Sequence, residues 1–166
     1  MNLLATFNDN DFEPKDYIDR PTVKAVIIND NDEVLLFSGG LPGGGVEENE
    51  TKEMALTREL VDEVWAVVTI VSEIGNVIAY RDSLKLRYVF TVYKCFLVSI
   101  VAPVTILGDE VGKLISWEKR EDAIIRIENE IAEIKMRDKN TFEEDRYQAR
   151  IFNREITILF LKQISK

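Results

Sequence analysis

Apolar residues along the chain alternate between the spacing of strands and the spacing of helices. Branched aliphatic residues dominate positions 22–29 and again 33–38, on either side of the polar turn Asp30-Asn31-Asp32. Two apolar runs joined by a short polar turn are typical of a β-hairpin. Other runs rich in β-branched and aromatic residues predict strands at residues 66–71, 86–100 and 114–117.

The clearest helix prediction covers Asn49 to Val64, where good helix formers fill the middle and either Asn49 or Thr51 can cap the start. At about 100° per residue, the apolar side chains share one broad face: Met54, Leu60, Val61 and Val64. The acidic side chains share the opposite face: Glu59, Asp62 and Glu63. The stretch is therefore an amphipathic helix with an acidic stripe.

Two later segments, residues 118–133 and 142–164, also have helical spacing. The second places large apolar side chains near one face: Phe152, Ile156, Leu159 and Phe160. The chain has no internal repeat, low-complexity stretch or linker, and 166 residues are enough to bury one core. We therefore expect a single α/β domain over residues 1–166, an α/β/α sandwich with a mixed β-sheet.

The formal net charge of −9 limits the partners that the chain can bind. A nucleic acid duplex or strand would meet a repulsive long-range field, so we expect neither as a partner. A small phosphorylated molecule is compatible with this charge, because a bound divalent cation reverses the sign of the field where carboxylates cluster. The expected partner is a small-molecule substrate.

Cysteine and histidine usage narrows the chemistry further. Cys95 is the only cysteine, and the chain has no histidine. These counts exclude an internal disulfide, a Ser/His/Asp triad and most zinc sites, and they favour core packing for Cys95. A lone thiol suits a reducing cytoplasm, and neither a signal peptide nor a membrane-spanning apolar stretch is present. We expect a cytoplasmic protein, without a membrane partner, whose chemistry depends on carboxylates.

Residues 39–45 have the sequence Gly-Gly-Leu-Pro-Gly-Gly-Gly, which cannot form a helix or a regular strand throughout. A loop of this kind lets the backbone approach another group closely. No Gly-Lys-Ser/Thr follows, which excludes a P-loop, and the glycine spacing does not match the dinucleotide-binding fingerprint.

The acidic stripe that follows this loop predicts a metal site. Glu59, Asp62 and Glu63 stand at helix positions i, i+3 and i+4, so they can point into one volume. Oxygen ligands on a rigid helix, beside a loop that admits a phosphate, are what Mg²⁺ or Mn²⁺ needs to neutralise a diphosphate. The alternative, a solvated acidic face over an ordinary core, leaves the upstream glycines and Glu50 unexplained.

The residues around this helix resemble the Nudix box. Gly44 is followed after five residues by Glu50 and after seven more by the run Arg58-Glu59-Leu60-Val61-Asp62-Glu63-Val64-Trp65-Ala66. The family pattern is Gly-x5-Glu-x7-Arg-Glu-U-x-Glu-Glu-x-Gly-U, in which U is aliphatic. The segment from Leu41 to Glu47 resembles the usual lead-in, and the flanking strands and the helix after Trp117 extend the resemblance.

This resemblance implies a Nudix-type hydrolase that cleaves a nucleoside diphosphate linked to another moiety, with Mg²⁺ or Mn²⁺ as cofactor. Glu59 and Glu63 match the family's principal metal ligands, and Asp62 stands at the first of its paired glutamates. Asp62 is one methylene shorter than glutamate, so a direct metal bond could become a bond through water.

The resemblance also assigns supporting roles. Arg58 and Glu50 match the pair that fixes the loop against the helix and so orients the ligands. Gly43 and Gly44 match the loop whose backbone amides approach the metal or the phosphates. Trp65 departs from the pattern, because the family's glycine ends the helix there in a left-handed conformation that costs another residue about 1–2 kcal/mol. We therefore expect this helix to end differently.

The general base and the substrate remain open. Glu63 itself, or the pair Asp109-Glu110 on a later loop, is a candidate base, although Asp109-Glu110 is equally compatible with a surface turn. Four side chains could stack on a base or contact a phosphate, but structural roles are commoner for such residues: Tyr80, Arg81, Arg87 and Tyr88. Nucleotide sugars, ADP-ribose, oxidised nucleoside triphosphates and dinucleoside polyphosphates all remain compatible.

Two other functional classes are also compatible with the sequence. A Nudix module that binds a nucleotide without turning it over would act as a sensor or partner-binding domain, and the departures at Asp62 and Trp65 favour it. A mainly structural protein without a nucleotide site is disfavoured by the glycine-rich loop. The apolar C-terminal helix could contribute to a homodimer, but packing on its own sheet explains the same pattern.

Overall fold

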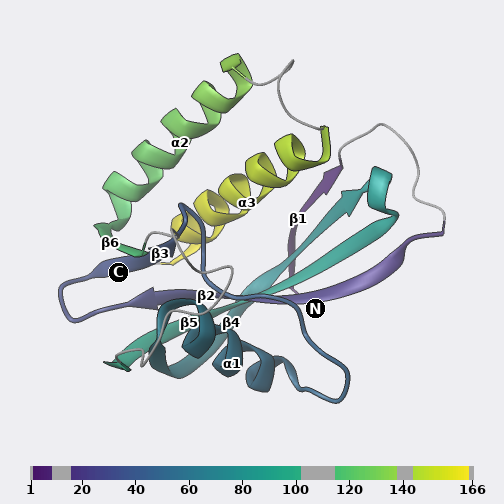
Figure 1. The fold of residues 1–166 in the computed structure, drawn as a ribbon. Helices are drawn as coiled ribbons and strands as arrows, with labels where there is room; N and C mark the ends of the chain where they lie inside the picture. Colours follow the sequence, from purple (N-terminus) through teal and green to yellow (C-terminus); the bar gives the residue numbers. More distant parts are fainter. Residues whose placement is uncertain (1, 9–15, 102–114, 138–143, 165–166) are drawn as a thin grey trace.

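A computed structural model describes residues 2–8, 16–101, 115–137 and 144–164 of the chain (Figure 1). Its centre is a six-stranded sheet with the order β1-β4-β5-β2-β3-β6. The strands are β1 (Leu3–Asn8), β2 (Ile18–Ile28), β3 (Glu33–Phe37), β4 (Ala66–Arg81), β5 (Leu86–Ile100) and β6 (Ile115–Lys119). The pairs β1/β4 and β2/β5 are parallel and the other neighbours are antiparallel, so the sheet is mixed as predicted.

In the described part of the chain, three helices cover the two faces of this sheet: α1 (Lys52–Val64), α2 (Arg120–Arg137) and α3 (Glu144–Gln163). A 3-10 turn, η1 (Asp82–Leu84), connects β4 to β5. Figure 1 shows α1 on one face and both α2 and α3 on the other. The α/β/α sandwich expected from the sequence is thus confirmed.

The alternation of side chains along β2 explains the two layers. Val23, Ala25 and Ile27 point to one face, where they form a core with buried residues of α1. Val26, one position out of phase, belongs to a second core that includes Ile127 of α2 and other buried residues of α2 and α3. Because both faces of this central strand are covered, its sequence is apolar almost throughout its second half.

The predicted hairpin and helices are present. β2 and β3 form the hairpin, and the side chain of Asn29 accepts hydrogen bonds from the backbone amides of Asn31 and Glu33 in its turn. Thr51 caps α1, because its hydroxyl accepts a hydrogen bond from the amide of Met54 at 3.2 Å.

The apolar face of α1 differs in detail from the prediction. Leu60 and Val64 are buried as expected, together with Ala55 and Leu56. Met54 and Val61, however, are 56% and 39% exposed, so only part of the broad apolar face is buried. The helix packs with a narrower stripe than its composition indicated, because only the residues nearest the sheet reach it.

The sequence prediction missed β1 and the second half of β4. Polar residues and bulges interrupt the apolar pattern of β4, whose register shifts between Ile70 and Ser72 and again between Glu73 and Gly75. A Cβ atom at Gly75 would lie 2.8 Å from Leu4 Cδ1, so glycine lets β1 pack closely beside this strand. Short edge strands and bulged strands carry a weak periodic signal, which explains both omissions.

The end of α1 also differs from the prediction. Trp65 adopts the left-handed conformation, with φ of 54° and ψ of 25°, and its amide caps the helix by bonding to the carbonyls of Leu60 and Val61. The carbonyl of Trp65 in turn accepts a hydrogen bond of 2.7 Å from the amide of Val101. The expectation of a different helix end was therefore wrong: these bonds hold a tryptophan in the conformation that glycine favours.

No helix among the described residues is long and apolar enough to cross a membrane.

Candidate active site

The glycine-rich loop, residues 39–45, lies beside β2. The strand β3 pairs with β2 near Ile28, and the loop contacts an earlier part of β2, where Thr22 forms a bridge with Gly45. The amide of Val23 donates to the carbonyl of Gly44 at 2.9 Å, and the amide of Ala25 donates to that of Pro42 at 3.0 Å. The loop is therefore joined to β2 by backbone hydrogen bonds of the kind that pair strands. It lies at the border between the face covered by α1 and the face covered by α3.

Two glycines of this loop are required for different reasons. Gly43 has a φ of 122°, and a Cβ atom there would lie 2.3 Å from the carbonyl oxygen of Val23. Gly44 has ordinary backbone angles, but a Cβ atom would lie 2.4 Å from the carboxyl carbon of Glu59. The backbone thus packs against β2 at the first position and against a carboxylate at the second.

Glu59 and Glu63 lie one helical turn apart on α1, and both are half-buried against this loop. Glu63 Oε2 accepts a hydrogen bond of 2.7 Å from the amide of Gly43, while Glu59 is in contact distance of the space beside Gly44. The helix therefore brings two carboxylates to two successive residues of the loop, at i and i+4 as its periodicity requires.

An arginine and a glutamate tie the same loop to the helix. Arg58 donates to both carboxylate oxygens of Glu50, at 2.8 and 2.9 Å, and to the carbonyl of Gly45 at 3.0 Å. Its third nitrogen donates to Glu59 Oε1 at 2.7 Å. This two-pronged bond to Arg58 lowers the pKa of Glu50 to about 2, with help from the backbone amide of Glu47, and the same bonds raise the pKa of Arg58.

The third predicted ligand is placed differently. Asp62 is exposed on α1. Within residues 2–8, 16–101, 115–137 and 144–164, no three acidic or other metal-binding side chains form a ready-made metal site. Glu110, the candidate base, lies outside the described residues. The ligand role of Asp62 and the catalytic role of Glu110 thus stay predictions.

The remaining donors suit a hard cation. Mg²⁺ is usually bound through one or two carboxylates, with waters and substrate phosphates as its other ligands. Glu59 and Glu63 provide two carboxylates, and neither Gly43 nor Gly44 places a side chain between them and the loop. The arrangement therefore fits a divalent ion that is completed by a bound diphosphate.

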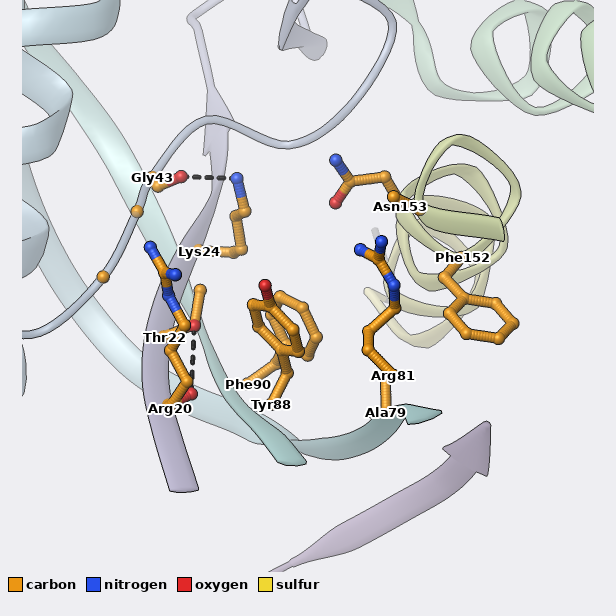
Figure 2. Close-up of a pocket in the computed structure, with 13 residues that line it drawn as sticks. Arg20, Thr22, Lys24, Gly43, Ala79, Arg81, Tyr88, Phe90, Phe152 and Asn153 are labelled. Atoms are coloured by element: carbon orange, nitrogen blue, oxygen red, sulfur yellow. Dashed lines mark hydrogen bonds between the residues drawn. The ribbon is translucent and has the colours of Figure 1, made fainter. Parts of the chain in front are cut away.

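On the other side of the loop lies a pocket of about 250 Å³ (Figure 2). Its walls come from the loop, from three strands and from α3: Arg20, Thr22, Lys24, Gly43, Gly44, Gly45, Ala79, Arg81, Tyr88, Phe90, Ala149, Phe152 and Asn153. Lys24 donates a hydrogen bond to the carbonyl of Gly43, so a cation stands where the pocket meets the loop. The lining is basic and aromatic, whereas the α1 side of the loop is acidic.

Of the four side chains considered from the sequence, two line the pocket and two lie elsewhere, because neighbouring positions on β4 and β5 face opposite sides of the sheet. Arg81 and Tyr88 line the pocket. Tyr80 instead packs edge-on against Tyr17, with ring centroids 5.2 Å apart, and Arg87 pairs with Asp19 through a bond of 2.6 Å. Residues one position apart on a strand point to opposite faces, which explains the division.

Several pocket residues were not singled out from the sequence. Arg20 and Lys24 belong to β2, while Phe152 and Asn153 belong to α3, far along the chain. The alternation of polar residues at Arg20, Thr22 and Lys24 is the one local signal that could have identified part of this wall. The contribution of α3 depends on tertiary packing and has no local signature.

Cys95 is fully buried in the core beneath α1, and burial raises the pKa of its thiol to about 12. A thiol with so high a pKa stays protonated near neutral pH and is a poor nucleophile. The packing role predicted for Cys95 agrees with this placement.

Comparison with known proteins agrees with the fold. A family model described as NUDIX domain matches residues 19–139, well over half of the chain. The fold is similar to that of a NUDIX hydrolase from Nitrosomonas europaea, with a TM-score of 0.55 and 23% identity over 66% of this chain and 77% of that chain. It is also similar to the MutT protein from Methanosarcina mazei Go1, with a TM-score of 0.53 and 15% identity over 86% and 96% of the two chains. No curated protein matches the sequence. The family match includes the glycine loop and α1, and it ends before α3.

Proposed function

The chain belongs to the NUDIX domain family, and from that premise we propose that it hydrolyses the diphosphate bond of a nucleoside diphosphate linked to another moiety, with Mg²⁺ or Mn²⁺. Family membership makes it a Nudix-type pyrophosphohydrolase; the nucleotide substrate and the metal are the proposal. The observation that carries it is the placement of Glu59 and Glu63 against Gly44 and Gly43, with a basic pocket on the other side of the loop.

In this proposal Glu59 and Glu63 hold the divalent ion. When bound, the ion would neutralise charge on the diphosphate and lower the pKa of the attacking water. Gly44 lets the carboxylate of Glu59 lie against the loop, because a Cβ atom there would be 2.4 Å from its carboxyl carbon, and Gly43 lets the loop pack against β2. Arg58 holds Glu59 and the loop in one arrangement through its bonds to Glu59, Glu50 and the carbonyl of Gly45.

The charge distribution supports an anionic substrate. The whole chain carries a formal net charge of −9, yet Arg20, Lys24 and Arg81 line the pocket next to the loop. A local basic patch in an acidic protein focuses anions toward itself. Lys24, which bonds to the carbonyl of Gly43, is placed to attract a phosphate that reaches the loop.

Proton transfer from the attacking water needs a carboxylate. Glu63 is our candidate among the described residues, because its carboxylate lies at the loop where the diphosphate would bind. Glu110 remains the second candidate. The two are distinguished by the pH profile of kcat in Glu63→Gln and Glu110→Gln variants, since only the loss of the base removes the acidic limb of that profile.

The test of the proposed function is a hydrolysis assay. The purified protein is incubated with ADP-ribose, a UDP-sugar, a nucleoside triphosphate and a dinucleoside polyphosphate, with Mg²⁺, with Mn²⁺ or with chelator. We expect metal-dependent hydrolysis of at least one compound and a loss of about 100-fold or more in Glu63→Gln. This variant suits the test because its amide oxygen can still accept the bond from Gly43 while the negative charge is lost.

Metal-dependent nucleotide binding without hydrolysis of any compound would contradict the proposal and favour the sensor alternative. One observation weakens that alternative. Trp65, which favoured it in the sequence, adopts the conformation of the glycine that it replaces and leaves the helix end intact.

A further inference from the structure

The glycine-rich loop is entered through a tight turn at the end of β3. Phe37 and Gly40 exchange two backbone hydrogen bonds, of 2.9 and 3.0 Å, across Ser38 and Gly39. Both central residues have a positive φ, 49° at Ser38 and 80° at Gly39, as a type I′ turn requires. This turn therefore sets the direction in which the chain enters the loop.

An ion pair between α2 and α3 packs on this turn. Arg154 of α3 donates through Nε to Glu130 Oε2 of α2 at 2.8 Å. A Cβ atom at Gly39 would lie 3.2 Å from Arg154 Nη2 and 3.3 Å from Glu130 Oε2. Both charged groups thus lie against the backbone of the turn, and Gly39 is needed for this contact as well as for its positive φ.

The pair is one end of a longer chain of alternating charges. Arg126 of α2 donates to both carboxylate oxygens of Glu118 on β6, at 2.8 and 3.0 Å, and its third nitrogen donates to Glu130. Glu130 therefore has two arginine partners, Arg126 from its own helix and Arg154 from α3. Because the carboxylate is held from both sides, Arg154 has a fixed partner beside the turn.

The contact between α3 and the loop continues one helical turn further on. Thr157 accepts a hydrogen bond of 3.2 Å from the amide of Leu41, and its hydroxyl oxygen would lie 3.6 Å from a Cβ atom at Gly40. The first three residues of the loop, Gly39, Gly40 and Leu41, thus meet α3 or its ion pair. The later glycines meet α1 instead, so the loop is held at both ends by different helices.

From this arrangement we propose that Arg154 is a positioning residue of the active site. Together with Glu130 it fixes the turn at Gly39, and the turn fixes the loop whose amide at Gly43 meets Glu63. Arg154 acts through the loop and needs no contact with metal or substrate. The family match ends at residue 139 and so assigns nothing to α3. The effect on catalysis rests on the proposed function, whereas the effect on the loop does not.

A second ion pair between the same helices shows what a merely structural role would be. Lys162 of α3 donates to Glu128 of α2 at 3.0 Å, and the two side chains are 55% and 51% exposed. The side chain of Arg154 is only 14% exposed, because the turn and Glu130 cover it. A shielded pair contributes more than a solvated one, and this pair alone of the two touches the loop.

Hydrogen–deuterium exchange of the full chain measures how firmly the loop is held, without metal, substrate or turnover. Mass spectrometry follows peptides that cover residues 36–45. We expect amides in these peptides to exchange about tenfold faster in Arg154→Met, because a shielded, charge-assisted bond beside the turn is lost. Lys162→Met is the matched control, since it breaks the other pair between α2 and α3, and it should leave exchange in residues 36–45 unchanged.

Glu130→Gln is the second variant, and it keeps the test decisive if Arg154→Met does not fold. It preserves the shape of the side chain and removes the charge that holds Arg154. We expect the same faster exchange in the loop peptides. Exchange no faster in Arg154→Met and Glu130→Gln than in Lys162→Met would overturn the inference. So would faster exchange spread evenly over the whole chain, because that reports a loss of global stability rather than a freed turn.

Steady-state kinetics on any compound that the chain hydrolyses adds a second measurement. We expect Arg154→Met to lower kcat about tenfold for every such compound and to leave KM within about twofold, because the loop orients the carboxylates of α1. Lys162→Met should leave both constants unchanged. A higher KM with unchanged kcat in Arg154→Met would contradict the positioning role.

The outcomes separate this inference from the proposed function. Faster loop exchange in Arg154→Met, in a protein that hydrolyses no compound of the panel, would support the role of Arg154 in holding the loop and contradict the function. Metal-dependent hydrolysis with unchanged loop exchange in both Arg154→Met and Glu130→Gln would leave the function in place and remove the positioning role.

Discussion

The two sides of the glycine-rich loop are built in different ways. On the α1 side, Glu63 bonds to Gly43 across only 20 residues of sequence, and Glu50, Arg58 and Glu59 lie within the same segment. On the pocket side, the walls come from β2, β4, β5 and α3, so residues from both ends of the chain must meet. The first side is acidic and the second is basic and aromatic.

Under the proposed function, we expect this difference to separate catalysis from substrate selection. The α1 side depends on helix periodicity and on two glycines, and its geometry is independent of the rest of the ligand. The pocket side depends on strand register and on the packing of α3, and its shape determines which ligand fits. We therefore expect changes on the α1 side to affect every substrate and changes on the pocket side to alter the preference among substrates.

The largest effect is expected for Gly44→Ala, whose added methyl group points at Glu59 on the α1 side. The added methyl group would lie 2.4 Å from the carboxyl carbon of Glu59 and must displace it. A misplacement of about 1 Å in a catalytic group can cost roughly 100-fold in rate, so we expect a loss of that order in kcat for all substrates. Steady-state kinetics on two substrates with different bases checks this expectation.

Gly45→Ala provides the control for stiffening of the loop, because a methyl group there meets no atom within 4 Å. Both variants should keep the melting temperature, since the carboxylate of Glu59 can move aside in Gly44→Ala. A loss confined to one of the two substrates would show that the two sides of the loop are not independent.

Thr157 connects the two sides, and its removal should have the next largest effect. This buried hydroxyl accepts a hydrogen bond of 3.2 Å from the amide of Leu41, at the start of the loop, and donates one of 2.7 Å to the carbonyl of Asn153. Thr157→Val leaves the buried amide without a partner, which should lower the free energy of unfolding by about 1–3 kcal/mol. Urea denaturation measures this loss.

Thr157→Ser keeps the hydroxyl and should recover most of that stability. If the Thr157→Val variant were as stable as the unmodified protein, the hydroxyl would contribute no net stability and the link from α3 to the loop would be unsupported.

A smaller effect is expected at the end of α1, where Trp65 adopts a left-handed conformation. Trp65→Gly and Trp65→Ala both remove the indole, but only glycine relieves the backbone strain. We expect the glycine variant to be more stable than the alanine variant by about 1 kcal/mol in thermal or chemical unfolding. Equal stabilities would mean that position 65 leaves the left-handed region once the indole is removed.

The smallest effect concerns the titration of Glu50. Its pKa of about 2 lies below the ordinary value of 4.5, so its bond to Arg58 stabilises the fold above the ordinary pKa and is lost only as the pH falls toward 2. The bond should therefore be constant throughout the neutral range. Carboxyl NMR titration should show the pKa of Glu50 near 2, rising toward 4.5 in Arg58→Gln; a value near 4.5 in the unmodified protein would contradict the pairing.

The same contrast between local and distant residues explains what the sequence could reveal. The helix α1, its cap at Thr51 and the placement of Glu59 and Glu63 follow from spacing within one segment, so they were predictable. The sequence could not show that Arg20, Phe152 and Asn153 line one pocket, because only the β2/β5 register and the packing of α3 bring them together. Tyr80 and Arg81 show the limit most clearly, since adjacent residues of one strand have different surroundings.

Trp65 was misjudged for another physical reason. A left-handed penalty of about 1–2 kcal/mol is small enough to be offset by the surrounding bonds, here from Trp65 to α1 and from Val101 to Trp65. The domain count, the role of Asp62 and the role of Glu110 depend on features that neither the sequence pattern nor this fold determines, and they stay predictions.

The most direct test of the central claim, that Glu59 and Glu63 hold the metal beside the glycine loop, is a Mn²⁺ titration followed by electron paramagnetic resonance. The unmodified protein is compared with Glu59→Gln, Glu63→Gln and, for the predicted third ligand on the exposed side of the same helix, Asp62→Asn. We predict that both glutamine variants bind Mn²⁺ about tenfold more weakly or worse, because even outer partners of metal ligands contribute 10–100-fold, and that Asp62→Asn has a smaller effect. Unchanged Mn²⁺ affinity in both glutamine variants would contradict the claim.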